Sequence, residues 1–175
     1  MTRALIHFLL LLLLFTGCSS KRSPESQPSK GPVSLRLEHD DKAGTISVFR
    51  KGSDKAIVTE NAKEDFRPFL HPIVAPDGQG VLTEYSPGHH KHQTGLYWGF
   101  TRVNGRDYFH NPGGDYWKRV SAQIVQDTGK VVEWRTVYDL LDEKGNAVMR
   151  ETQTWSMRET DGKYFIDLEW KGDAQ

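Results

Sequence analysis

Apolar and polar side chains alternate with a period of two over the C-terminal part of the chain. Two runs of alternate positions are apolar or aromatic: Val132, Trp134, Tyr138 and Leu140, and then Tyr164, Ile166, Leu168 and Trp170. The opposite positions carry charged side chains: Glu133, Arg135 and Asp139, and then Asp167 and Glu169. Residues two apart lie on the same face of a β-strand. The pattern therefore predicts two strands, each with one buried face and one solvated face.

Turn sequences separate these and other candidate strands. Asn104-Gly105 lies between two apolar runs and indicates a hairpin, because a type I′ turn needs positive φ at both central residues. The segments DEKGN at 142–146 and ETDGK at 159–163 have similar turn chemistry. No stretch after the N-terminal segment keeps a helical period. Together with five tryptophans, these features predict an all-β fold, an antiparallel β-sandwich.

The extreme N-terminus has a different pattern. Arg3 precedes an apolar run over residues 8–15, which is typical of a secretory signal and too short to span a bilayer as a mature helix. The sequence FTGC at 15–18 resembles a bacterial lipobox, in which the cysteine is lipidated after cleavage. Cys18 is the only cysteine, so a disulfide within the chain is excluded. We expect a signal peptide over residues 1–17 and a lipid anchor on Cys18; the alternative is a plain signal peptide with an incidental cysteine.

Residues 18–32 join this signal to the rest of the chain. They are rich in Ser, Pro and Lys and hold no large apolar side chain that could anchor a fold, which predicts a flexible tether. The resemblance to bacterial lipoproteins implies outward sorting, because Ser19 follows the cysteine, and we expect the protein in the outer membrane or periplasm. Residues 33–175 suit a single domain. Because the chain stops just after an apolar strand, we expect this domain to be incomplete at its C-terminus.

The charge balance narrows the choice of partners. Of the 23 Lys and Arg residues, Arg3 lies in the predicted signal peptide, which leaves 22 against 23 Asp and Glu residues. A net charge near −1 gives no support for a nucleic-acid partner, which normally requires a basic patch or stripe. The expected partners are therefore the membrane, through the lipid anchor, and a carbohydrate, for the reasons given below.

The candidate chemistry is concentrated in the segment SPGHHKHQTGLYWGF at 86–100. Pro87-Gly88 excludes a helix over the histidines. If the histidines lead into a strand, His90 and His92 point to the same side and His89 to the other. Two imidazoles on one face suit a divalent transition metal such as Zn, Fe, Cu or Ni. The third ligand would then come from elsewhere in the chain, and the candidates are His71, His110 and Glu84.

Two other interpretations of these histidines stay open. His90 and His92 could act as general acid and base, because an imidazole titrates close to physiological pH. They could also belong to a solvated turn with no chemical role. The neighbouring aromatic residues favour a binding site, although most of them are expected in the core. Tyr85 and Trp98 are the candidates for stacking on a sugar ring.

Three stretches carry a resemblance to a known family: RPFLHPIVAPDG, the turn PGHHKH followed by GLYWGF, and VNGRDYFHN. Over residues 33–175 the chain resembles the bacterial PmoA-like family, whose members are labelled methane oxygenase PmoA. Members often read D-H-P-H-H-R-G-L-W, which matches His90 and His92 here. The chain departs from that pattern at Gln93, where many members have histidine, and at Thr94, where they have arginine.

Methane oxidation conflicts with the physical character of the chain. A subunit of a membrane methane monooxygenase needs several spans of about 20 apolar residues, and no such run follows Cys18. The fold pattern is more similar to the galactose-mutarotase-like supersandwich. That resemblance implies sugar chemistry, with His90 or His92 as the general acid and with Tyr85 and Trp98 beside the sugar.

Two functions follow as expectations. The first is an exported lipoprotein enzyme of the carbohydrate-active kind, similar to an epimerase, lyase or hydrolase, that uses His90 and His92, with His71 as a further metal ligand or in acid–base chemistry. The second is a non-catalytic surface lipoprotein that binds glycans or a protein, in which the histidines only shape a loop.

Overall fold

The computed structural model describes residues 31–175. The predictions of a signal peptide over residues 1–17, of lipidation at Cys18 and of most of the tether at 18–32 lie outside this range. Every regular element of the described residues is a β-strand, as predicted. None of these residues forms a helix long and apolar enough to cross a membrane.

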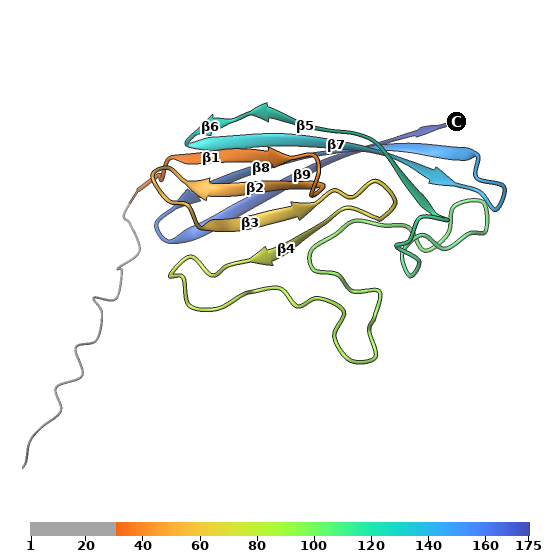
Figure 1. Cartoon of the computed structure of the whole chain (residues 1–175), viewed down its shortest axis with the longest axis horizontal. Helices are drawn as coiled ribbons and strands as arrows, with labels where there is room; N and C mark the ends of the chain where they lie inside the picture. The colour runs from red at the N-terminus through yellow and green to blue at the C-terminus, as the bar shows by residue number, and fades with distance from the viewer. Residues whose placement is uncertain (1–30) are drawn as a thin grey trace, which may run out of the picture.

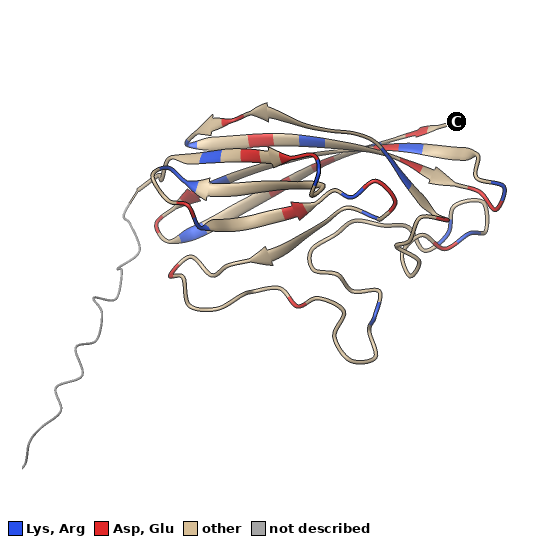
Figure 2. Ribbon diagram, viewed as in Figure 1, with Lys and Arg blue, Asp and Glu red and all other residues tan. Residues whose placement is uncertain are grey.

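Two antiparallel sheets lie one over the other as a sandwich (Figure 1). The first sheet has the strand order β4-β3-β2-β1-β6, and the second has the order β5-β7-β8-β9. The first sheet consists of β1 (Leu35–Asp40), β2 (Thr45–Arg50), β3 (Ala56–Asn61), β4 (Phe69–Ile73) and β6 (Thr128–Gly129). The second consists of β5 (Trp117–Gln126), β7 (Val131–Leu141), β8 (Ala147–Thr160) and β9 (Lys163–Ala174). Acidic and basic residues are interspersed along both sheets (Figure 2).

The alternation predicted for β7 and β9 is confirmed. On β7 the four apolar positions of the predicted face are all fully buried: Val132, Trp134, Tyr138 and Leu140. On β9 the residues of the predicted inner face are half-buried, and those of the other face are exposed. Most inner residues of both strands pack in one apolar cluster of the core. Tyr138 and Leu140 belong to a second apolar cluster, and Trp170 packs beside it.

The three predicted turns are present, although one of them does not join two strands. The β7–β8 turn is closed by Asp142, whose carboxylate accepts hydrogen bonds from the backbone N–H groups of Lys144 and Asn146, both at 2.8 Å. Positive φ occurs at both central residues of the β8–β9 turn, and likewise at Asn104 (50°) and Gly105 (84°). The latter turn closes only an isolated bridge between the residues on either side of it. Phe100 and Tyr108 on its two flanks pack into the core instead of forming strands.

A long connection over residues 74–116 runs from β4 to β5; its first part lies below β4 in the view of Figure 1, and the part that leads to β5 lies to the right. The connection pairs with β4 at one point: Leu96 and Leu70 form an isolated antiparallel bridge with two backbone hydrogen bonds of 2.8 and 3.1 Å. This approach requires glycine at position 95, where φ is +125° and a Cβ atom would lie 2.3 Å from the carbonyl oxygen of Leu70. Nearly all the predicted site residues lie on this connection, whereas His71 lies on β4.

A belt of buried polar side chains separates two apolar clusters in the core. Glu60 on β3 accepts hydrogen bonds from the Trp134 indole at 2.5 Å and from the Thr136 hydroxyl at 3.3 Å, and thereby links the two sheets. Glu151 on β8 accepts hydrogen bonds from Gln153 at 2.7 Å and from the Trp170 indole at 3.0 Å. These bonds satisfy carboxyl oxygens that burial would otherwise leave unpaired.

Burial also changes the protonation of the two glutamates. Loss of water around Glu60 raises its pKa to about 8, although the donated hydrogen bonds oppose the rise. The same cause raises the pKa of Glu151 to about 7. Glu60 is therefore largely a neutral acid at neutral pH.

We expect Glu60 to make the protein more stable in mild acid than at pH 8. Its folded-state pKa lies above the ordinary value of 4.5, so the stabilisation is complete below about pH 4.5 and is lost as the pH rises toward 8. Over this window one such group lowers the free energy of unfolding by up to about 1.4 kcal/mol per pH unit. Urea unfolding at several pH values measures this slope.

In Glu60→Gln the slope is expected to become shallower, because glutamine can pair with Trp134 and Thr136 without titrating. Glu151 retains its own contribution in that variant. Glu143→Gln, a change at an exposed position of the β7–β8 turn, serves as the control and should leave the slope as it is. Equal slopes in the wild type and in Glu60→Gln would contradict the assignment of a neutral Glu60.

Candidate functional site

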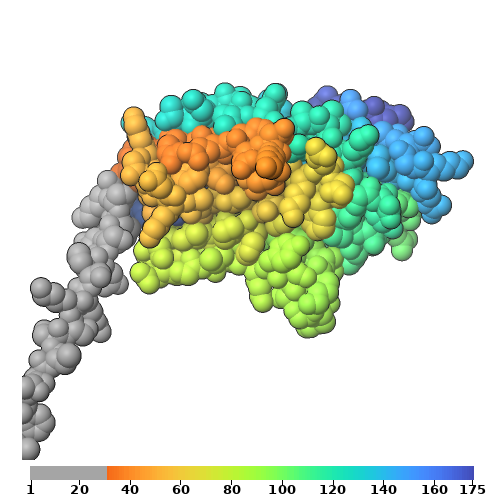
Figure 3. All heavy atoms as spheres, viewed as in Figure 1, coloured from red at the N-terminus to blue at the C-terminus, as the bar shows by residue number. Residues whose placement is uncertain are grey.

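Residues 86–93, named here the histidine loop, project from the body of the sandwich (Figure 3). Two successive turns form the loop, with His90 N–H donating to the Pro87 carbonyl at 2.8 Å and Gln93 N–H donating to the His90 carbonyl at 2.9 Å. Ser86 N–H donates to the Gln93 carbonyl at 2.6 Å and closes it. The absence of a helix was predicted, but the histidines do not form a strand either. The prediction that His90 and His92 point to the same side of a strand is therefore wrong.

The imidazoles form a chain of contacts across two segments. Within the loop, the ring centroids of His89 and His90 are 4.1 Å apart, and those of His90 and His92 are 6.0 Å apart. The closest partner of His92 outside the loop is His110, with a centroid separation of 4.4 Å. The ring of Phe109 lies 5.6 Å from His92 and 5.1 Å from His110.

Asp107 holds His110 in a defined orientation. One carboxylate oxygen lies 2.7 Å from Nδ1 of His110, and the other accepts hydrogen bonds from the backbone N–H groups of Phe109 and His110 at 3.0 and 3.1 Å. A carboxylate can only accept, so the hydrogen-bond network assigns the proton to Nδ1. When His110 is neutral, its Nε2 therefore carries a free lone pair. Half of the His110 side chain is exposed, so a ligand can reach it.

The electrostatics of the group favour a neutral His92 beside an ionised Asp107. Partial loss of water, followed by the neighbouring His110 and His90, lowers the pKa of His92. Partial burial would raise the pKa of Asp107, but the hydrogen bonds from His110 and Phe109 outweigh it and lower the pKa overall. The ionised Asp107 therefore places its negative charge directly beside the His110 ring.

Arg67, just before β4, joins the two segments that carry these groups. It is fully buried, and its guanidinium donates hydrogen bonds to the carbonyl oxygens of Phe109 and His92, the latter at 2.7 Å. It also reaches the Thr94 hydroxyl at 3.4 Å and lies over the Tyr97 ring, 3.5 Å from its centroid. Burial lowers the pKa of Arg67 to about 10, which leaves it charged at neutral pH.

The structure does not bring the three predicted metal ligands together. His71 on β4 places its Nδ1 2.9 Å from the Thr83 hydroxyl, and its ring contacts Tyr85. Only His90 and His92 of that set have rings near one another. Among residues 31–175, no group of three or more His, Cys, Asp or Glu side chains is arranged to hold a metal ion.

The two aromatic candidates contact different strands. Tyr85 is half exposed and packs beside Phe69 and His71 at centroid distances of 5.7 and 5.9 Å. The Trp98 side chain is 43% exposed, and its ring centroid lies 6.1 Å from that of Trp170 on β9. Each presents an open aromatic surface, but the contacts do not make them opposite walls of one site.

No role was predicted from the sequence for Asp107 or for Arg67. The spacing Asp-x-x-His in DYFH is a local signal that could have identified Asp107, because a turn can close over three residues. Arg67 has no comparable signal, since its partners lie 25 to 42 positions away. Thr94, at which the chain departs from the PmoA-like pattern, is a buried acceptor for Arg67.

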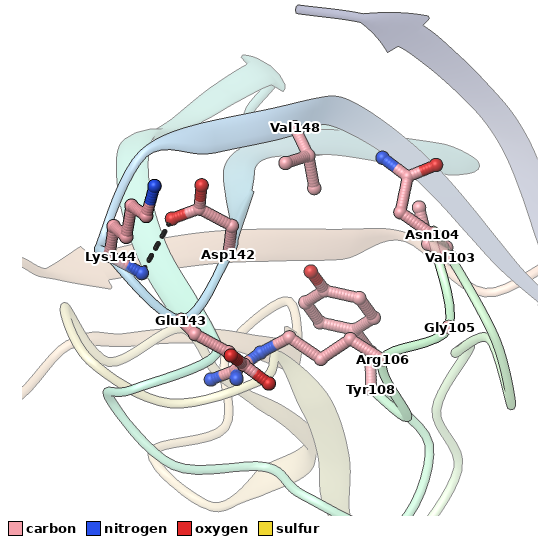
Figure 4. Close-up of a pocket in the computed structure, with 9 residues that line it drawn as sticks. All are labelled: Val103, Asn104, Gly105, Arg106, Tyr108, Asp142, Glu143, Lys144 and Val148. Carbon is pink, nitrogen blue, oxygen red and sulfur yellow. Dashed lines mark hydrogen bonds between the residues drawn. The ribbon is translucent and has the colours of Figure 1, made fainter.

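Two of the surface clefts on the long connection differ in their relation to the predicted site residues. One, with a volume of about 480 Å³, includes Glu84, Gln93, Tyr97 and Phe109 in its lining and adjoins the histidine loop. The other, about 370 Å³, lies between the β7–β8 turn and the Asn104-Gly105 turn, and the side chains that line it are drawn in Figure 4. None of the predicted site residues lines this second cleft.

Comparisons with known proteins identify the family to which the chain belongs. No curated protein and no solved structure matches the chain. A family model described as a family of unknown function, DUF6807, matches residues 34–175, which is most of the chain. The chain therefore belongs to the family of unknown function DUF6807.

Proposed function

We propose that this protein acts on carbohydrate by general acid–base catalysis, with His110 oriented by Asp107 and with His92 as its partner. The observation that carries the proposal is the short Asp107–His110 hydrogen bond beside the His92 ring. A carboxylate that fixes the tautomer of an imidazole and stabilises its protonated form is the arrangement that makes histidine an efficient base. This replaces the predicted pair His90 and His92 by His92 and His110, with His90 as a neighbour.

The proposed chemistry is a proton transfer. Nε2 of His110 takes a proton from a hydroxyl or an acidic C–H group of the sugar, and Asp107 stabilises the imidazolium that forms. His92, as a neutral imidazole, donates a hydrogen bond from its ring N–H to the ring or carbonyl oxygen on which negative charge develops. A positioned acid or base of this kind accelerates a reaction by roughly 10²–10⁴-fold.

The choice of carbohydrate rests on two supports. One is the similarity of the sequence pattern to the galactose-mutarotase-like supersandwich and to PmoA-like proteins, without the methane chemistry of a membrane monooxygenase. The other is the open aromatic surface of Tyr85 and Trp98, since aromatic faces suit the C–H faces of sugars. The same surfaces favour a second candidate, a glycan-binding lipoprotein without catalysis.

We also propose that the protein is exported and held at the outer membrane, or in the periplasm, by lipid on Cys18. The support is the N-terminal sequence: an apolar signal followed by a lipobox-like FTGC. In this arrangement the sandwich acts on glycans at the membrane surface.

Replacing Cys18 by alanine is expected to move the protein from the membrane fraction to the aqueous fraction, because the acceptor for the lipid is lost. Detergent phase partitioning and mass spectrometry of the N-terminal peptide measure the change. Ser19→Ala serves as the control and should keep the lipid. An unmodified Cys18 in the wild-type protein would contradict the anchor.

Asp107→Asn and His110→Gln are each expected to lower turnover of a sugar substrate by roughly 10²–10⁴-fold. Asparagine would place an N–H group opposite Nδ1 and favour the wrong tautomer, and glutamine removes the base. Anomeric interconversion and deuterium incorporation from D₂O, followed by NMR over a panel of sugars, measure the rates. His89→Gln, a change in the histidine loop at a residue without a carboxylate partner, should keep the wild-type rate. Equal rates in all four proteins would reject the catalytic pair, and binding without turnover would favour the second candidate.

A further inference from the structure

We propose that the cleft of about 480 Å³ beside the histidine loop binds a single neutral sugar ring, and that Glu84 makes it select against acidic sugars. This inference rests on the proposed function and names the substrate class of that same site. The volume lies within the range of about 300–1,000 Å³ typical of small-molecule sites.

The position of the cleft connects it to the proton-transfer group. Phe109 forms part of its lining, and the same ring contacts His92 and His110. Gln93, another lining residue, directly follows His92 in the chain. The cleft therefore shares Phe109 with the proton-transfer group, although neither imidazole is part of its lining.

Two polar side chains of the cleft have free hydrogen-bonding capacity. Neither the Glu84 carboxylate nor the Gln93 amide forms a hydrogen bond or an ion pair with any of the described residues, whereas the Thr83 hydroxyl is already engaged with His71 and Ile73. A carboxylate can accept from two neighbouring hydroxyls, and an amide can both donate and accept. Adjacent sugar hydroxyls match this pair of groups.

Two apolar residues of the lining are highly exposed. Leu82 is 64% exposed and Leu96 is 41% exposed, and the aromatic ring of Tyr97 lies between the cleft and the Arg67 guanidinium. Leu82 and Leu96 are two of the nine large apolar side chains that are exposed in the described residues. Their apolar surface inside the cleft suits the C–H face of a sugar.

The charge of the cleft sets the selectivity. Glu84 is its one charged lining residue, and the nearest lysine in the sequence, Lys91, places its ammonium group 3.4 Å from the Ser86 carbonyl. Unpaired negative charge repels the carboxylate of a uronic acid, whereas neutral hydroxyls gain charge-assisted hydrogen bonds. The expected ligands are thus neutral hexoses or pentoses rather than uronates.

Calorimetric or NMR titration of the folded protein with matched pairs of neutral sugars and their uronic acids tests the proposal. The wild type is expected to bind a neutral member of the panel and to discriminate against its uronate. Glu84→Gln should weaken neutral-sugar binding roughly ten-fold, the effect of losing one charge-assisted hydrogen bond, and should narrow the discrimination. Gln93→Ala should weaken binding without changing the discrimination. Both positions are at the surface or half-buried, so folding should be preserved.

Glu143→Gln is the matched control, because Glu143 is a carboxylate in the other cleft (Figure 4), and it should leave both affinities unchanged. The cleft is ruled out as the sugar site if no sugar of the panel binds, or if sugars bind and turn over with affinities that do not change in Glu84→Gln and Gln93→Ala. Binding that depends on Glu84 without any turnover supports the cleft and rejects the catalytic part of the proposed function. The two proposals can therefore fail separately.

Discussion

The candidate site depends on a buried guanidinium that needs acceptors. Arg67 is fully buried and takes part in none of the ion pairs of the described residues, and burying a charge without partners is costly. Its donors reach the backbone carbonyls of His92 and Phe109 instead, and its flat face lies over Tyr97. The two Nη groups of this cation therefore link the histidine loop to the segment that carries His110, while its buried Nε has no hydrogen-bond partner among the described residues. Neither segment has strand pairing that would do so.

The sandwich supplies the fixed frame for this arrangement. Arg67 lies immediately before β4, and β4 also holds the long connection through the Leu70–Leu96 bridge that Gly95 permits. Within the core, the polar belt joins the two sheets through the neutral acid Glu60. Directional hydrogen bonds therefore hold the two sheets together in addition to apolar packing. The proton-transfer groups thus lie on irregular segments, while their positions derive from the buried Arg67 and from the attachment of the connection to β4.

Local patterns predicted the fold well, because alternation and turn chemistry are encoded by neighbouring residues. The buried face of β7, the Asp142 turn and the fold class all follow from residues at most a few positions apart. The site was predicted only in part: His92 and His110 were candidates, but their pairing depends on Arg67 contacts across 25 to 42 residues of sequence. The assumed strand at His89–His92 failed because Pro87-Gly88 and the φ of 51° at Ser86 turn the chain back on itself. His71 lies on β4 and pairs with the Thr83 hydroxyl, away from the other predicted metal ligands.

The most direct test of this account is the nuclear Overhauser effect between the ring protons of His92 and His110, compared in the wild type and in Arg67→Met. Methionine keeps much of the side-chain volume but removes every donor. The account predicts a clear effect between the two rings in the wild type and its loss in the variant, while the cross-strand effect between Trp134 and Trp155 persists and reports an intact sandwich. An effect of undiminished intensity between His92 and His110 in the folded variant would contradict the central role of Arg67.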